Sequence, residues 1–203
     1  MEDSPIRQNF TTRFWEYYRI LEDDCVILRR FVSFRAENMS TCSDEIIKQL
    51  LSVSAEFDGL CKEITGISKE RPTIVDYSKW FFTNQNNSNL KQTDIVLKNS
   101  DIILQPFLSW GATKDDIMPW WEAYNLVKHD RNKNYTFGTL KNLLDALSAL
   151  YFLECYQYKQ ISLKYSTERH ILFDVPPDQS KLFYIKDFKT KSYVFGHDLF
   201  GSD

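Results

Sequence analysis

Two long segments near the start of the chain repeat apolar residues at the three- and four-residue spacing of an amphipathic helix. The first segment covers about residues 12–34. Its apolar positions are Phe14, Tyr17, Leu21, Cys25, Leu28 and Val32. The second segment follows a polar turn in which Thr41 or Ser43 is the expected N-cap, and it continues to Gly66. Two helices joined by a short turn predict an antiparallel helical hairpin.

Two further helices are expected in the second half of the chain. One begins between Asp115 and Pro119, where acidic residues and a proline suit a first helical turn. The other runs from Thr139 to about Tyr165 and carries the longest apolar stripe in the sequence. That stripe consists of Leu140, Leu143, Leu144, Leu147, Leu150, Tyr151 and Leu153. The pattern therefore predicts a mainly α fold, an antiparallel bundle of about four long helices.

An irregular insertion around residues 69–112 interrupts the helical pattern. Pro72 is expected to open a short helix, which the polar run TNQNNSN follows. Two β-rich pieces, at residues 94–97 and 101–104, then predict a small hairpin.

After residue 168 the apolar pattern changes from helical spacing to alternation, which is typical of strands. The alternating pieces are residues 171–175, 181–185 and 192–196. They predict two or three short strands, arranged as a C-terminal β-hairpin or a short antiparallel sheet. We therefore expect a helical bundle domain over residues 1–168 and a β appendage over residues 169–203.

The composition narrows the classes to which the protein can belong. The 203 residues include 43% hydrophobic ones, enough for a single domain with a real core. The net charge of −3 argues against coating of duplex DNA through bulk electrostatics, although a local basic pocket is compatible with it. There is no apolar run long enough to span a bilayer, and the first ten residues do not have the pattern of a signal peptide. We expect a cytoplasmic protein without a membrane segment.

The four cysteines have no paired spacing. Cys25, Cys42, Cys61 and Cys155 are scattered along the chain, so neither a zinc site nor a disulfide framework is indicated. We interpret them as small buried hydrophobic residues. No metal or other cofactor is predicted, because the sequence contains no dense group of ligand residues and no phosphate-cradling or dinucleotide motif.

The segment WWEAYNLVKHDR, residues 120–131, is the strongest candidate for chemistry. If it is helical, Asn125, Lys128 and His129 lie on one stripe, and Trp121 lies one turn upstream on the same side. An imidazole can transfer protons near neutral pH, and an adjacent cation can hold a phosphate. This combination is the minimum needed for phosphodiester chemistry.

The segment resembles the HEPN superfamily, compact bundles of about four helices, many of which are metal-independent ribonucleases of toxin–antitoxin, phage-defence and CRISPR systems. The family signature is an arginine, usually followed by asparagine, with histidine four to six residues after the arginine. Tyr124, Asn125 and His129 fall on these three positions, so the arginine is missing. The resemblance covers roughly residues 12–165. The segment is also similar to a YNxxKHxR pattern in bacterial proteins of unassigned function.

The resemblance implies that an RNA 2′-hydroxyl attacks the adjacent phosphate without a metal ion. His129 would be the acid or base, and Asn125 would orient the histidine or the phosphate. Lys128 and Arg131 would hold negative charge, while Tyr124 and Trp121 would contact the substrate. Two protomers often bring their motifs together in this family, so the resemblance also implies a homodimer.

A non-catalytic interpretation fits the same residues. Lys128, His129 and Arg131 all suit the negative end of a helix dipole, and Asn125 can tie down a loop. Trp120 and Trp121 suit core packing. The missing arginine favours this alternative, an interaction module or antitoxin-like subunit with a cognate protein partner.

Other polar residues give weaker signals. Glu56 and Asp58 are typical of the solvated face of a helix, although either can bring a carboxylate towards the cluster. Arg29 or Arg30 can replace the missing arginine or pair with such a carboxylate. His170 and His197 are expected on the surface.

Overall fold

The computed structural model describes residues 12–83, 90–165, 176, 179–186 and 188. The helices are α2 (Thr12–Leu28), α3 (Asp44–Thr65), α4 (Ile74–Thr83), α5 (Pro119–His129) and α6 (Leu140–Tyr165). The strands are β1 (Ile95–Leu97), β2 (Ile103–Leu104) and β3 (Phe183–Ile185). The prediction of a mainly helical fold with a small antiparallel sheet is confirmed.

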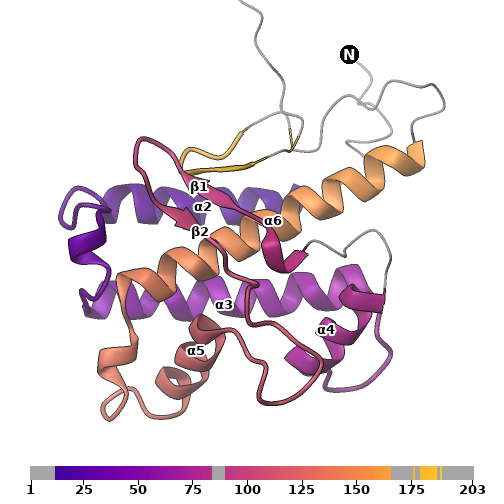
Figure 1. Cartoon of the computed structure of the whole chain (residues 1–203), viewed down its shortest axis with the longest axis horizontal. Coiled ribbons are helices and arrows are strands. Elements are labelled where there is room, and N and C mark those ends of the chain that lie inside the picture. Colours follow the sequence, from indigo (N-terminus) through magenta and orange to yellow (C-terminus); the bar gives the residue numbers. More distant parts are fainter. Residues whose placement is uncertain (1–11, 84–89, 166–175, 177–178, 187, 189–203) are drawn as a thin grey trace, which may run out of the picture.

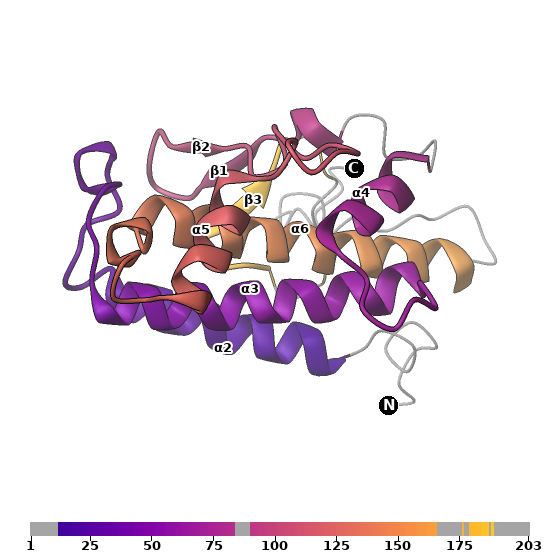
Figure 2. The same ribbon diagram turned by 90° about the horizontal axis from the view of Figure 1, so that it is seen from below.

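Helix α3 is the central element of the bundle. It packs against α2 on one side and against α5 on the other, and α6 crosses it (Figures 1 and 2). Helices α2 and α3 form the predicted antiparallel hairpin (Figure 1). Helix α6 begins at the same end as α3, because the amide of Leu140 donates to the Thr41 carbonyl at 2.9 Å. The connections α2–α3 and α5–α6 therefore lie together at one end of the molecule.

The helix ends follow local signals in the sequence. The Ser43 hydroxyl accepts a hydrogen bond from the Ile46 amide at 3.1 Å, which caps the start of α3. Gly66 ends α3 with φ of 57°, a left-handed conformation that glycine adopts without a steric penalty. Pro119 is the first residue of α5, as expected. Helix α2 ends at Leu28, earlier than predicted, because the amides of Arg30 and Phe31 donate to carbonyls only three residues earlier.

The buried face of α2 is largely the predicted one, since Leu21, Cys25 and Leu28 are buried. Tyr17 belongs to the predicted apolar stripe, yet 41% of its surface is exposed. The residues that α2 buries in the core are Trp15, Tyr18, Leu21, Glu22, Cys25 and Leu28. Three of the four cysteines, Cys25, Cys61 and Cys155, are buried as predicted, whereas Cys42 is half-buried.

The sheet joins two parts of the chain that the sequence separates. Its strand order is β2-β1-β3 and both pairs are antiparallel. The hairpin predicted at residues 94–104 is confirmed as β1 and β2, with Ile95 opposite Leu104. Strand β3 pairs with β1, so the 69–112 insertion and the C-terminal part form one sheet. The predicted strands at 171–175 and 192–196, like His170 and His197, lie outside the described residues.

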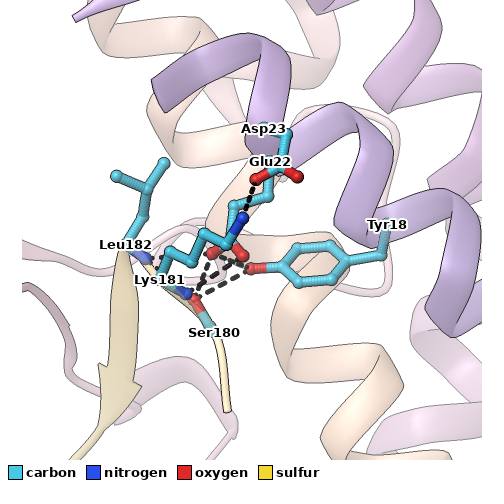
Figure 3. A network of polar contacts seen from close by, with 6 residues as sticks. All are labelled: Tyr18, Glu22, Asp23, Ser180, Lys181 and Leu182. Carbon is cyan, nitrogen blue, oxygen red and sulfur yellow. Dashed lines mark hydrogen bonds and ion pairs between the residues drawn. The ribbon is translucent and has the colours of Figure 1, made fainter. Parts of the chain in front are cut away.

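A buried carboxylate fixes the start of β3 against α2 (Figure 3). Glu22 Oε1 accepts hydrogen bonds from the Tyr18 hydroxyl at 2.9 Å, from the Leu182 amide at 3.0 Å and from the Ser180 hydroxyl. Glu22 Oε2 accepts one from the Lys181 amide at 3.0 Å. Since Glu22 is fully buried, these donors replace the water that its charge would otherwise need.

Among the helices that the structure describes, none combines the length and the apolar character needed to cross a bilayer.

Candidate functional site

Helix α5 carries the predicted cluster and packs its apolar side on α3 and α6. The helix starts at Pro119 and ends at His129, so the predicted stripe of Asn125, Lys128 and His129 is formed. Arg131 lies just beyond the helix, in the turn that leads to α6. Lys128 and His129 occupy its last turn, where cations interact favourably with the helix dipole.

The polar groups of Asn125 and Lys128 bind within their own helix. The Asn125 amide donates to the Trp121 carbonyl at 2.9 Å, and the side chain is half-buried. Lys128 Nζ donates to the Tyr124 hydroxyl at 3.1 Å and lies 5.1 Å from the centre of the Tyr124 ring. Neither of these contacts reaches His129, which Asn125 would orient if the resemblance held, the phosphate being the other group that it could orient.

Trp121 and Tyr124, the predicted substrate contacts, are mostly buried. Their exposed fractions are 7% and 6%, and their ring centroids are 5.1 Å apart. The Trp121 ring also lies 5.8 Å from that of Phe57 on α3. The two side chains contribute to the aromatic core, and little of either ring is accessible for stacking with a base.

Asn134 caps the C-terminal end of α5, so His129 is not needed as a cap. The Asn134 amide donates to the carbonyls of Leu126 at 2.8 Å and Asp130 at 3.0 Å. His129 and Arg131 are exposed, and within the described part of the chain neither forms a hydrogen bond or an ion pair. The end of α5 and the turn after it thus expose His129 and Arg131 to solvent, next to the exposed Lys128, without partners in the described ranges.

The other residues that the sequence suggested for the site lie away from α5. Arg29 places its guanidinium 5.9 Å from the centre of the Phe34 ring and lines a hollow of about 540 Å³ between the α2–α3 connection and the β1–β2 turn. Arg30 is exposed. Asp58 accepts a hydrogen bond from the Tyr77 hydroxyl at 3.2 Å and pairs with Lys62 at 3.0 Å. None of these contacts involves α5.

Glu154 is an unusual polar residue that the sequence analysis did not single out. It lies on α6, is fully buried, and neither carboxyl oxygen has a hydrogen-bond partner in the part of the chain that the structure describes. Burial, and next the negative charge of Glu56 on α3, raises the pKa of Glu154 well above its usual range. One turn later, the buried side-chain oxygen of Gln157 also lacks a hydrogen-bond partner among the described residues. The sequence signal that could have identified this residue is the position of a glutamate within the longest apolar stripe.

Over the described ranges, no three His, Cys, Asp or Glu side chains gather as metal ligands would. Comparisons of the chain with models of protein families, with curated proteins and with solved structures found no match.

Proposed function

We propose that this chain is an RNA-binding protein of HEPN-like type that contacts RNA phosphates through the end of α5. One observation carries the proposal: Asn134 caps the α5 carbonyls, and within the described residues His129 and Arg131 are exposed without partners. Arginine provides a fork of donors that matches phosphate, and histidine adds a further donor. Following the resemblance, such a protein would act in the cytoplasm, in a bacterial toxin or defence system.

Binding is better supported than cleavage. Cleavage requires a positioned base and a cation at the phosphoryl oxygens. His129 has no orienting partner in the described part of the chain, because Asn125 donates to the Trp121 carbonyl. Tyr124 occupies the motif position of the arginine and is buried. A tyrosine cannot supply a permanent charge there.

The test measures the affinity of the purified chain for a labelled single-stranded RNA by fluorescence anisotropy at several salt concentrations. Arg131→Ala should weaken binding and reduce the salt slope by about 0.7, the value for one phosphate contact on a single strand. His129→Ala should also weaken binding. Lys69→Ala is the matched control, since it removes a remote cation already paired with Asp76 at 2.7 Å.

The same samples, incubated with a chelator, report on cleavage. The proposal expects the RNA to remain intact with wild type and with His129→Ala. Cleavage by wild type alone would favour the metal-independent ribonuclease that the resemblance implies. Binding that is equal for wild type, Arg131→Ala and Lys69→Ala would rule out the end of α5 as the contact site.

A second candidate is a protein-interaction module, and the exposed face of α2 favours it. Large apolar side chains on that face remain exposed in the described part of the chain. Exposed apolar patches of this kind mark interaction surfaces. A homodimer, which the resemblance also implied, is one form that this interaction can take.

A further inference from the structure

The turn between α5 and α6 carries two exposed aromatic side chains. Tyr135 and Phe137 belong to a short 3₁₀ helix, η4 (Tyr135–Phe137), and 37% and 44% of their surfaces are accessible to solvent. Neither ring packs against another aromatic ring among the residues that the structure describes. Both flat faces of an aromatic group are therefore near the end of α5 and open to a ligand.

Hydrogen bonds hold the backbone of this turn in one conformation. The amides of Phe137 and Gly138 donate to the carbonyls of Asn134 and Tyr135, both at 3.0 Å. From the first turn of α6, the side-chain amide of Asn142 donates to the Phe137 carbonyl at 2.8 Å. The two rings are thus attached to a backbone that is already ordered. A ligand that stacks on them loses little affinity to the ordering of the chain.

The winding of the turn places a cation beside one of the rings. The Asn134 amide donates to the Asp130 carbonyl, four residues earlier, at 3.0 Å, which is the hydrogen bond of an α-helical turn. In a chain wound this way, residues four apart are neighbours, with Cβ atoms about 5–6 Å apart. Arg131 and Tyr135 have this spacing. Lys133 is less available, because it pairs with Asp130 at 3.3 Å.

A guanidinium beside an exposed ring matches the two parts of a nucleotide. The cation binds the phosphate, and the ring stacks on the base. In duplex RNA each base is covered on both faces by its neighbours, so a side chain on the surface of a protein can stack only on an unpaired base. Stacking also tolerates every base, because each has a π face.

We propose that Tyr135 stacks on an unpaired base of the RNA whose phosphate Arg131 contacts, and that Phe137 stacks on a neighbouring base. This inference rests on the function proposed above and adds to it the residues that contact the bases. These two rings take the role that the resemblance gave to Trp121 and Tyr124, which are mostly buried. Recognition through stacking should depend little on the sequence of the RNA.

The experiment is a double-mutant cycle between the two rings and the bases. Fluorescence anisotropy gives the dissociation constants of wild type and of the double variant Tyr135→Ala/Phe137→Ala. Each protein is measured with a single-stranded RNA and with a strand of equal length that lacks its bases. Removal of the bases should weaken wild type roughly tenfold and the double variant very little. Any change in the stiffness of the strand cancels, because both proteins meet the same strand.

Two further variants control for the ring itself. Tyr135→Phe keeps an aromatic ring and should bind like wild type. Tyr184→Ala removes a tyrosine of similar exposure, 42%, from β3 and should leave the effect of base removal unchanged. Thermal melts of all variants establish that the chain is folded.

The salt dependence separates stacking from contacts with phosphate. The double variant should keep the salt slope of wild type, because the rings carry no charge, whereas Arg131→Ala should reduce it. Duplex RNA of the same sequence should bind wild type and the double variant with equal affinity, since its bases are covered.

Two results would overturn the stacking proposal. In one, base removal weakens wild type and the double variant by the same factor. In the other, Tyr184→Ala lowers the effect of base removal as much as the double variant does. A reduced salt slope for Arg131→Ala would then leave the phosphate contact standing without the stacking. If Arg131→Ala instead binds as wild type does, while the rings and the bases remain coupled, the proposed phosphate contact fails and the stacking stands. Absence of RNA binding by wild type would overturn both.

Discussion

Replacing Glu154 with methionine should stabilise the protein, and the gain should grow as pH rises. The wild-type carboxyl is fully buried on α6 and has no hydrogen-bond partner in the described structure. A buried polar group without a partner costs about 1–3 kcal/mol, and an apolar replacement of similar shape removes that cost. Methionine has nearly the length of glutamate and adapts readily to irregular space.

The pH dependence follows from the raised pKa of Glu154, caused mainly by burial and next by the charge of Glu56. Above the ordinary value of 4.5 the unfolded chain loses the proton, while the folded chain retains it up to the raised pKa. The folded state then binds more protons, so the free energy of unfolding falls with pH by about 1.4 kcal/mol per unit. This contribution to stability is complete below pH 4.5 and is lost as pH rises through the folded pKa.

Urea unfolding of wild type and Glu154→Met between pH 5 and pH 7 measures the difference. The gap should widen with pH, by up to about 1.4 kcal/mol per unit for as long as the folded chain keeps the proton, with unchanged m-values. Glu70→Met, which removes an exposed carboxylate, is the control and should show no widening. A gap that stays constant with pH, or a variant less stable than wild type throughout, would refute the reasoning, because it would mean that the charged carboxylate is stabilised inside the bundle.

Three further substitutions test contacts that hold the fold. Glu22→Gln puts a donor where buried donors already point, so it should cost about 2–4 kcal/mol in urea unfolding and reduce hydrogen-exchange protection at the start of β3. Ser43→Ala removes the α3 cap and should cost about 1 kcal/mol, measured by thermal unfolding; an unchanged melt would show that the cap is dispensable. Gly138→Ala would place a Cβ 2.1 Å from a side-chain carbon of Ile47, and should cost about 1–3 kcal/mol in the same assay.

Much of the fold was predictable from local signals. The Ser43 cap, Gly66 and Pro119 act on their own helices, so the sequence alone located those helix ends. On α2 only the position of Tyr17 was misjudged, because both sides of the helix carry apolar residues and the neighbouring helices decide between them. The pairing of β3 with β1 was also not predictable, since it joins strands more than eighty residues apart and no local pattern encodes that partner.

Part of the candidate site was also predictable from local signals in the sequence, and part was not. The helical stripe of Asn125, Lys128 and His129 follows from periodicity and is formed. The hydrogen bonds of Asn125 and the capping role of Asn134 depend on the geometry of a turn that the spacing does not specify. Whether the end of α5 binds RNA stays a prediction.

The contact between Glu22 and Ser180 joins residues 158 positions apart. At roughly 5–20 residues per second, a ribosome needs on the order of 10–30 s to synthesise the intervening chain. During that interval the partners of Glu22 from residues 180–182 do not yet exist, and the carboxylate must stay hydrated. Water can therefore leave this part of the core only after residues 180–182 have been made, which places the closure of the bundle late in synthesis.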